Sequence, residues 1–315
     1  MRFLCVCLSP AIDATVRLDA WPSDGCIIKD AVDTFAPGGK GLNVARWLAV
    51  RSLAEANGRQ AEGVRREPTQ HRIACGGLLG ADNAAVFERE MAKYGIEDRF
   101  VRVSGATRVN EMFVSPQGSF KINRSAFPSL QVSCLPSPAS LVEGPADMVI
   151  LSGSLPKGCP DDTYRRLVEA AKAMGAKTVL DASGKALVEG VKAHPDVIKP
   201  NAGECETLVG FVPKTSDEFR KATAALKAFC DYPIISDGAA GCWFNGAFFP
   251  APKVKVLDTT AAGDTLLAEW CFSGDPRRAV ASGSAACTMP GGEPPSLSLV
   301  ESLVEADDWS FTIFE

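Results

Sequence analysis

The chain has 315 residues, of which 46% are hydrophobic and 23% charged, proportions typical of a soluble globular protein. This length suits one large α/β domain or two smaller ones. The net charge of −5, with no basic block and no apolar run of membrane-spanning length, argues against nucleic acid or a membrane as partner.

The eleven cysteines are scattered and include no CxxC pair, which is typical of reduced thiols in the cytoplasm rather than of disulfides or a metal site. The two histidines, His71 and His194, lie in a polar stretch and before a proline. Neither resembles a catalytic base or a zinc ligand. A hydrolase that uses Ser154 is therefore a poor hypothesis, and acid–base chemistry is expected from carboxylates or lysines.

Residues 3–8 are all apolar and predict a buried first strand of a parallel sheet. Asp13 follows this strand, at the sheet edge where ligands bind in open parallel sheets. A solvated turn residue is the alternative for Asp13. Residues 14–36 alternate in polarity and contain turn residues, which predicts short antiparallel strands that form a flap.

A glycine-rich stretch, Pro37-Gly38-Gly39-Lys40-Gly41, precedes the next predicted helix. Glycines let the backbone approach a ligand closely, and the N–H groups at a helix start attract anions. With the charge of Lys40, the stretch suits a phosphate or the hydroxyl groups of a sugar. It is not a Walker A loop, because glycine rather than Ser or Thr follows the lysine.

Residues 51–71 are polar, and we expect them to extend this helix and then form a surface insertion. Residues 107–123 have a hairpin pattern that would pair with the flap, so a lid is predicted from about 14–36 and 105–125. Arg108 and Asn110 lie two residues apart and share a strand face. Arg108 suits phosphate binding, although an ordinary surface arginine is the alternative.

From residue 148 onward, apolar strands alternate with helices, which predicts a parallel sheet covered on both faces. The polar turns after these strands would line one edge of the sheet and form one crevice. They comprise residues 152–158, 199–204 and 236–241.

The turn at residues 257–265 follows a strand-like run, residues 254–256, and precedes a predicted helix. The free N–H groups and the dipole of a helix start would attract an anion there. Asp264 in such a turn suits a base that removes a proton beside the stabilised charge. A simple helix N-cap is the alternative, and the local sequence leaves both readings open.

Together these motifs resemble those of the PfkB, or ribokinase-like, carbohydrate kinases, and within them the branch of 1-phosphofructokinases and tagatose-6-phosphate kinases. The resemblance covers residues 8–292, and its most specific parts are residues 37–46, 151–156, 199–204 and 258–264. It implies a three-layer α/β/α fold with a mostly parallel central sheet and a small β-sheet lid, as one domain over residues 1–315. It also implies ATP and Mg²⁺ as cofactors, a sugar phosphate as substrate, and the lid as a candidate homodimer surface.

The resemblance further implies roles for individual residues. Asp264 would be the general base, beside an anion hole formed by the amides of Ala261, Ala262, Gly263 and Asp264. The sugar and its phosphate would be held by Asp13, Lys29, Gly38, Gly39, Lys40, Asn43, Arg108, Asn110 and Ser154. The nucleotide would be held by Lys199, Asn201, Glu204, Ser236, Gly238, Gly241, Ser282 and Gly283. Of these, Asn201 and Glu204 would also organise Mg²⁺ through water.

Two departures from the family pattern bear on activity. Ala261 stands where the family usually has glycine, and a left-handed backbone there would cost alanine about 1–2 kcal/mol. Residues 124–126 differ from the usual lid motif, which leaves the sugar open. The expected reaction is phosphorylation of fructose 1-phosphate to fructose 1,6-bisphosphate; tagatose 6-phosphate, another sugar, or binding by an inactive pseudokinase are the alternatives.

Overall fold

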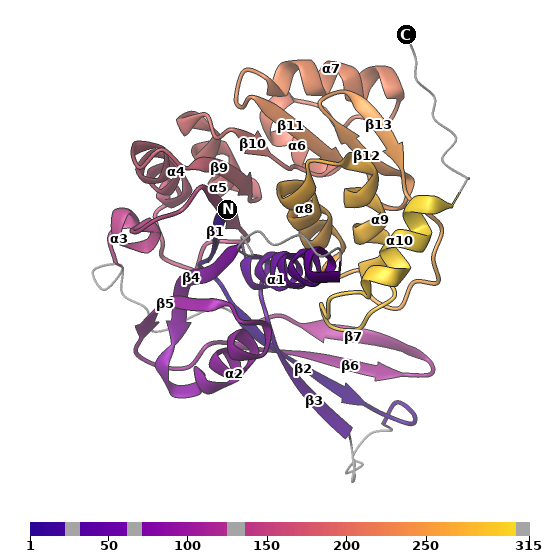
Figure 1. Ribbon diagram of the computed structural model, residues 1–315. Helices are drawn as coiled ribbons and strands as arrows, with labels where there is room; N and C mark the ends of the chain where they lie inside the picture. The colour runs from indigo at the N-terminus through magenta and orange to yellow at the C-terminus, as the bar shows by residue number, and fades with distance from the viewer. Residues whose placement is uncertain (23–31, 62–70, 125–135, 307–315) are drawn as a thin grey trace.

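The computed structural model describes residues 1–22, 32–61, 71–124 and 136–306, which form two sheets and the helices around them (Figure 1). The larger sheet has nine strands. In spatial order they are β13 (Ala247–Pro250), β12 (Gly241–Phe244), β11 (Tyr232–Ser236), β10 (Val197–Ile198), β9 (Lys177–Asp181), β8 (Met148–Ser152), β1 (Arg2–Cys7), β4 (Arg72–Gly80) and β5 (Glu97–Val103).

All pairings in this sheet from β11 to β5 are parallel, whereas β12 pairs antiparallel with both β11 and β13. The central strands are continuous apolar runs, as expected where helices cover both faces. Successive side chains of β1 enter opposite hydrophobic clusters: Phe3 packs in one and Leu4 in the other. The prediction of a mostly parallel sheet is therefore confirmed.

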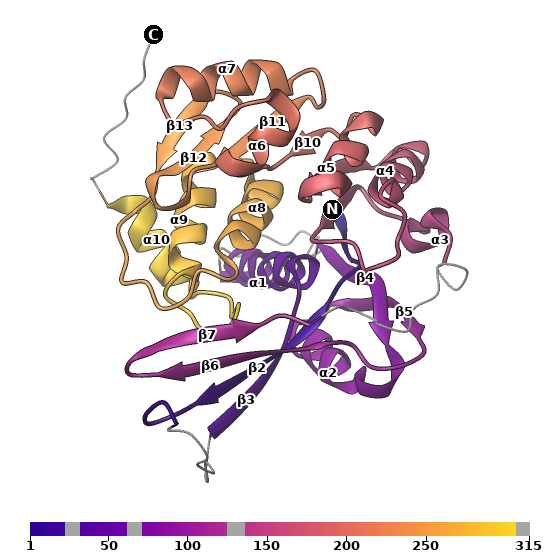
Figure 2. The ribbon, with the colours of Figure 1, turned by 180° about the vertical axis from the view of Figure 1, so that it is seen from behind.

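Helices cover both faces of the large sheet and complete the expected three layers (Figures 1 and 2). The cluster that contains Phe3 is shared by α1 (Lys40–Ala61), α2 (Ala85–Tyr94), α8 (Ala262–Ser273), α9 (Pro276–Ala286) and α10 (Leu297–Glu305). The cluster that contains Leu4 is shared by α3 (Pro138–Val142), α4 (Thr163–Ala173), α5 (Gly184–Gly190), α6 (Ala202–Val209) and α7 (Ser216–Leu226).

The smaller sheet projects from one side of the molecule (Figure 1) and has the order β3 (Val32–Gly38), β2 (Ala11–Arg17), β6 (Val109–Ser115) and β7 (Gly118–Ile122). The β2–β3 and β6–β7 pairs are antiparallel, and β2 pairs with β6 in parallel. Both segments of the expected lid thus contribute strands to one sheet. Lys29 lies outside the described residues.

The strand expected at residues 254–256 is not formed, which corrects the sequence analysis. The side chains of Val256 and Leu257 are exposed, and the amides of Leu257 and Asp258 both donate to the carbonyl of Cys287 rather than to a strand. Alternating polarity predicts a strand only where a neighbouring strand is present to pair with it.

The polar stretch after the glycine-rich turn behaves partly as expected. Helix α1 continues to Ala61, which confirms the predicted extension, whereas residues 62–70 of the expected insertion lie outside the described residues. Across the described ranges, we find no helix that has both the length and the hydropathy needed to cross a membrane.

Candidate active site

The first turn of α8 presents unused amide groups. Among the described residues, the amides of Ala261, Gly263 and Asp264 have no hydrogen-bond acceptor, whereas that of Ala262 donates to the Thr259 carbonyl at 3.3 Å. Three of the four amides expected in an anion hole are therefore free. Ala261 has φ −107°, so alanine occupies this position without the strain of a left-handed backbone.

Asp264, in the same turn, is only 3% exposed. Its Oδ2 accepts a hydrogen bond of 2.9 Å from Nδ2 of Asn43. Burial is the main cause that raises the pKa of Asp264 from 3.8 to about 7; Asp181 raises it further, whereas Lys40, Asn43 and Lys199 oppose the rise. A carboxylate with a pKa near neutrality is suited to accept a proton at physiological pH.

The glycine-rich turn brings the start of α1 against the end of β1. Gly39 has φ 131°, and a Cβ there would lie 2.7 Å from Sγ of Cys7, so only glycine fits. A Cβ on Gly41 would lie 2.9 Å from the carbonyl oxygen of Val6. This close approach places Lys40 and Asn43 at the edge of the sheet beside Asp264.

Asp181, at the end of β9, joins two lysines, and sequence analysis missed it. Its carboxylate is buried; Oδ1 and Oδ2 lie 3.2 Å from Nζ of Lys40, and Oδ1 lies 3.3 Å from Nζ of Lys199. Burial disfavours the charge on Lys40, but Asp181 and Asp264 raise its pKa above the usual value. The argument that selected Asp13, a carboxylate at the end of a parallel strand, applies equally to Asp181.

A cavity of about 260 Å³ lies between the small sheet and the first turn of α8. Of the residues expected to hold the sugar, Asp13, Gly39, Lys40, Asn43, Arg108, Asn110 and Ser154 line it, together with Asp264. Gly38 is not in the wall, but a Cβ on it would lie 2.3 Å from Oδ2 of Asp13. The structure thus brings together residues that are far apart in the sequence.

Among the described residues, two cations lie on the lid side of this cavity. Lys121 of β7, which sequence analysis did not select, has its ammonium group 3.3 Å from Oδ1 of Asp13, an atom that also accepts a 3.1 Å hydrogen bond from Asn110. The guanidinium group of Arg108 donates to the carbonyls of Pro10 and Ser9, and burial lowers its pKa. These contacts hold both cations at the cavity wall.

A second cavity of about 580 Å³ lies between α8, α9 and the turn after β11. Of the residues expected along the nucleotide, Asn201, Ser236, Gly238, Gly241 and Gly283 line it, together with Ala262 and Gly263. Ser282 is fully buried and is not among the lining residues, so its place beside the adenine stays a prediction. The first turn of α8 therefore borders both cavities, with Asp264 in the first and Ala262 and Gly263 in the second.

Two further residues expected at the nucleotide lie near this wall. The ammonium group of Lys199 would be 3.5 Å from a Cβ on Gly263, so it reaches the first turn of α8. Glu204 forms a capping box with Asn201 at the start of α6: the Asn201 amide donates to Oε2 of Glu204 at 2.9 Å, and the Glu204 amide donates to Oδ1 of Asn201 at 2.8 Å.

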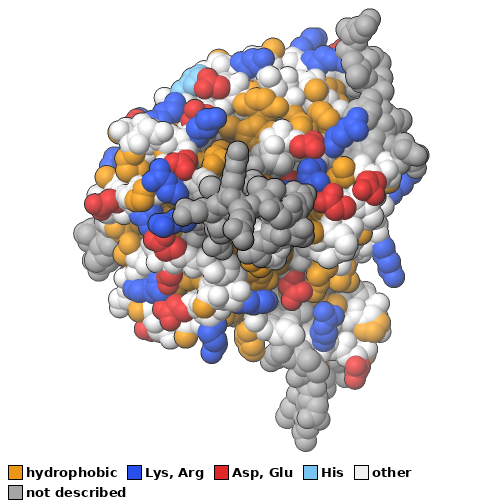
Figure 3. Space-filling view, viewed as in Figure 1, with side chains coloured by type: hydrophobic (Ala, Val, Ile, Leu, Met, Phe, Trp, Pro, Cys, Tyr) orange, Lys and Arg blue, Asp and Glu red, His pale blue; other side chains and the backbone are white. Residues whose placement is uncertain are grey.

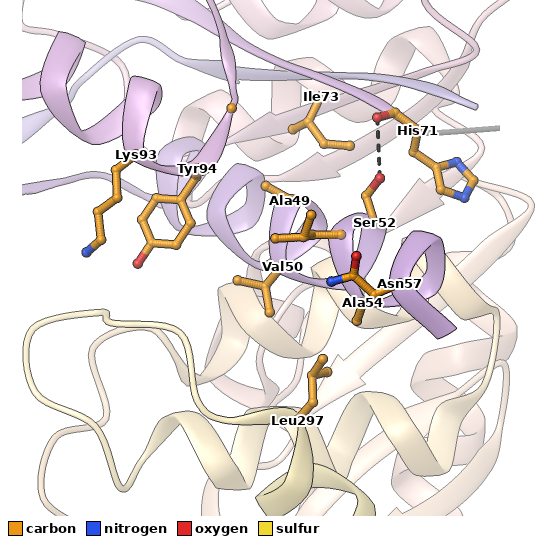
Figure 4. A pocket seen from close by; sticks show the side chains of 12 residues that line it. Ala49, Val50, Ser52, Ala54, Asn57, His71, Ile73, Lys93, Tyr94 and Leu297 are labelled. Atoms are coloured by element: carbon orange, nitrogen blue, oxygen red, sulfur yellow. Dashed lines mark hydrogen bonds between the residues drawn. The ribbon is translucent and has the colours of Figure 1, made fainter. Parts of the chain in front are cut away.

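Another cavity, of about 560 Å³, lies along the later turns of α1 and contains none of the expected site residues (Figure 4). Its wall is mostly apolar, with Val50, Ile73 and Leu297 among its members, and the Ser52 hydroxyl donates to the His71 carbonyl beside it.

Figure 3 shows lysine and arginine side chains interspersed with aspartate and glutamate over the visible face, with no large field of one sign.

Comparisons with known proteins show the family of this chain. The model of the pfkB family of carbohydrate kinases matches residues 5–289. The 1-phosphofructokinase of Rhodobacter capsulatus is 31% identical over 279 residues, which cover 85% of this chain and 82% of that protein.

Two solved structures are similar in fold. Phosphofructokinase-2 from Escherichia coli in complex with substrates and products has a TM-score of 0.78 at 21% identity and covers 96% of this chain and 98% of its own. Ribokinase from Giardia lamblia has a TM-score of 0.66 at 17% identity, with coverage of 96% and 99%. With the family model matching most of its length, the chain belongs to the PfkB family of carbohydrate kinases, and its fold is that of ribokinase.

Proposed function

We propose that this chain transfers the γ-phosphoryl group of ATP to the C6 hydroxyl of fructose 1-phosphate, with Asp264 as general base. The observation that carries the proposal is the first turn of α8, which presents its carboxylate to one cavity and Gly263 to the other. The 1-phosphofructokinase relative supports the choice of acceptor. Tagatose 6-phosphate is the alternative substrate of the same chemical class.

In this reaction the sugar oxygen forms a bond to the γ-phosphorus while the bond from that phosphorus to its bridging oxygen breaks. Asp264 accepts the hydroxyl proton, which contributes about 10²–10⁴-fold. The free amides of Ala261, Gly263 and Asp264, with the helix dipole, stabilise the charge that spreads over the phosphoryl oxygens. The chain supplies positioning and charge rather than a covalent intermediate.

The sugar lies in the smaller cavity, where Asp13 accepts hydrogen bonds from its hydroxyl groups and Asn110 donates hydrogen bonds to them. Arg108 and Lys121 hold the phosphate that is already on the sugar, because both cations line the lid side of that cavity. Lys40 takes a different role from the one first expected: since Asp181 holds it beside Lys199, it neutralises the transferred group. A contact of Lys29 with the sugar phosphate stays a prediction.

ATP occupies the larger cavity, whose volume of about 580 Å³ and glycine-rich wall suit a nucleotide. Asn201 and Glu204 would hold a magnesium ion through water, because Mg²⁺ usually keeps several waters and is bound through only one or two carboxylates. When bound, the ion would neutralise charge on the ATP phosphates.

The chain forms a homodimer through the small sheet. Phe35, Phe120 and Ile122 are 63%, 50% and 41% exposed, and alternation along the strands places them on the face opposite Asp13 and Lys121. An exposed apolar sheet face of this kind marks an interaction surface. A cytoplasmic location is supported by the free thiols of the described cysteines.

A coupled assay of ADP release tests the function, with fructose 1-phosphate, tagatose 6-phosphate, fructose 6-phosphate and fructose as acceptors. We expect the highest kcat/KM with fructose 1-phosphate. Activity on fructose alone would remove the proposed phosphate pocket, and calorimetric binding of a sugar phosphate without any turnover would favour a pseudokinase. The negative φ of Ala261 takes away one reason for the pseudokinase alternative.

A further inference from the structure

Arg46 is a buried arginine of α1 that has no assigned role in the proposed site. Its side chain is 3% exposed and lies one turn after Asn43. Nη1 donates to Oδ1 of Asn43 at 3.1 Å, and Nη2 donates to the carbonyl of Pro37 at 2.5 Å. Nε lies 2.8 Å from Oε1 of Glu90 in α2, as an ion pair. The guanidinium group is thus anchored by the turn before α1 and by a second helix.

The orientation of the Asn43 amide decides which atom faces Asp264. An asparagine side chain offers an acceptor on one side and a donor on the other, whereas a guanidinium group only donates. Oxygen must therefore face Arg46, and the NH₂ group then faces Asp264, where Nδ2 lies 2.9 Å from Oδ2. Gly292 leaves room for this orientation, since a Cβ there would lie 3.1 Å from Oδ1 of Asn43.

We propose that Arg46 is a positioning residue, which fixes the amide of Asn43 so that Asp264 always faces a hydrogen-bond donor. The proposal rests on the proposed role of Asp264 as base. A donor stabilises the ionised carboxylate more than the neutral acid. Without Arg46, Asn43 is free to turn its oxygen towards a protonated Asp264 and to stabilise the inactive acid form.

Other ionisable groups also act on Asp264: Lys40 of α1, Asp181 of β9, Lys199 after β10 and the thiol of Cys7 in β1. The two lysines favour the carboxylate, and Asp181 disfavours it. Within the described ranges, no hydrogen bond or ion pair links Arg46 to any of these four groups. Within the described residues, the contacts of Arg46 therefore lead to Asp264 by way of Asn43.

The pH dependence of kcat in Arg46→Met tests the proposal. The acid limb of the profile is the pH range in which kcat falls as the pH decreases. Loss of the fixed donor is expected to move this acid limb upward by about one pH unit, so that turnover at neutral pH falls several-fold. Arg46→Lys keeps a donor-only group and is expected to restore most of the wild-type profile. A variant that loses only stability would show the same acid limb as the wild type.

Arg51→Met is the matched control. Arg51 lies on the same helix and pairs with the buried Glu269 at 2.9 Å, so its loss also removes a cation from a buried carboxylate. It contacts neither Asn43 nor Asp264, and its acid limb is expected to stay in place. Equal displacement in Arg51→Met and Arg46→Met would overturn the proposal, because the effect would then be one of general stability.

A double-variant cycle asks whether Arg46 acts through Asn43. Asn43→Ala alone should move the acid limb upward, and adding Arg46→Met should move it no further. Additive displacements would overturn the proposal that Arg46 acts through Asn43. A folded Arg46→Met protein whose acid limb does not move would overturn it as well. Arg46→Gln, which is shorter and uncharged, replaces Arg46→Met if the latter does not fold, with the same displacement expected.

A second readout separates this inference from the proposed function. If the wild type phosphorylates no sugar of the panel, the proposed function fails, but Asp264 can still be titrated by carbon-13 NMR of its carboxyl group. Its signal is assigned by its loss in Asp264→Asn. The pKa of Asp264 is expected to be higher in Arg46→Met than in the wild type, and equal values would overturn the proposal that Arg46 acts through Asn43.

Discussion

The ammonium group of Lys40 lies 3.2 Å from both carboxylate oxygens of Asp181, although 141 positions separate the two residues in the chain. Asp181 is 1% exposed and also lies 3.3 Å from Lys199. Because an isolated buried carboxylate is costly, the two lysines and the carboxylate stabilise one another. The cluster fixes two positive charges beside the first turn of α8.

The first prediction concerns the pH dependence of the wild-type enzyme. Burial raises the pKa of Asp264 to about 7, and only the ionised form accepts a proton. We therefore expect kcat/KM for fructose 1-phosphate to be full above that pH and to fall about tenfold for each pH unit below it. Initial rates measured across the pH range check this, and a profile that stays flat down to about pH 5 contradicts it.

The second prediction uses the opposite charges beside Asp264. Asp181→Asn removes a negative charge that raises the pKa of Asp264, so its acid limb should move to lower pH. Lys40→Met removes a positive charge that lowers this pKa, so its acid limb should move to higher pH. Both are measured as kcat against pH, with Asp147→Asn at the exposed Arg2 ion pair as control. Displacements of the same sign would contradict the charge assignment.

The third prediction concerns Asp264→Asn. The pKa of Asp264 is about 7 in the folded state, above the ordinary value of 3.8 that applies to the unfolded chain. The contribution of wild-type Asp264 to the free energy of unfolding is therefore fully present below pH 3.8 and is lost as the pH rises through 7. The difference between the two pKa values corresponds to about 4 kcal/mol of folding free energy. The amide of asparagine stays neutral and avoids the cost of a buried charge. Asp264→Asn should therefore gain stability over the wild type between about pH 5 and 8, while turnover falls about 10²–10⁴-fold.

Urea denaturation at the two ends of this pH range measures the effect. A stability difference that does not change with pH would mean that Asp264 is not protonated on folding. Sugar-phosphate binding by calorimetry should persist in the variant, since Asp13, Arg108 and Lys121 remain in place.

The sequence predicts those site residues that belong to local motifs, and it fails for residues whose place depends on partners far away in the chain. Gly39, Asn43 and Asp264 belong to local motifs in which glycine, charge and a helix start follow one another, and the structure brings them together at one edge of the sheet. Lys121 belongs to no such motif, and its place is set by Asp13 in another strand, so that only the folded chain shows it. Asp181 ends a strand and could have been selected on that ground, but its pairing with Lys40 is seen only in the folded chain.

The fold likewise has parts that local sequence patterns predict and parts that tertiary packing decides. Apolar runs and helical spacing predict a parallel sheet covered on both faces, because burial acts on each element locally. The run at residues 254–256 has the alternation of a strand but no strand to pair with, and that is decided by tertiary packing. The backbone of Ala261 could not be predicted from its neighbours either, since alanine adopts either conformation at a different cost.

The fourth prediction concerns Ala261→Gly, which restores the residue usual in the family. Because φ of Ala261 is −107°, glycine relieves no strain, and we expect kcat to change less than about twofold. Stability should fall slightly, by up to about 1 kcal/mol, as the unfolded chain gains freedom. A rise of kcat by an order of magnitude would instead show that the alanine impairs the anion hole.

The fifth prediction concerns the outward face of the small sheet. The Phe113 and Phe120 rings stack at 4.8 Å, and Phe35 is the most exposed aromatic side chain on the same face. Replacing Phe35 and Phe120 with serine removes apolar area from the proposed interface, at about 25 cal/mol for each Å² that the dimer buries. We expect sedimentation to show a dimer for the wild type and mainly monomer for this double variant.

Leu53→Ser is the control for this experiment, because Leu53 is a comparably exposed apolar side chain, at 57%, that lies on α1 rather than on the small sheet. Its sedimentation should match that of the wild type. A wild-type monomer at micromolar concentration would contradict the proposed interface, and a dimer that survives the loss of both phenylalanines would place the contact elsewhere. Because Asp13 and Lys121 lie on the opposite face of the same strands, a dimer that stiffens this sheet should also lower KM for the sugar phosphate.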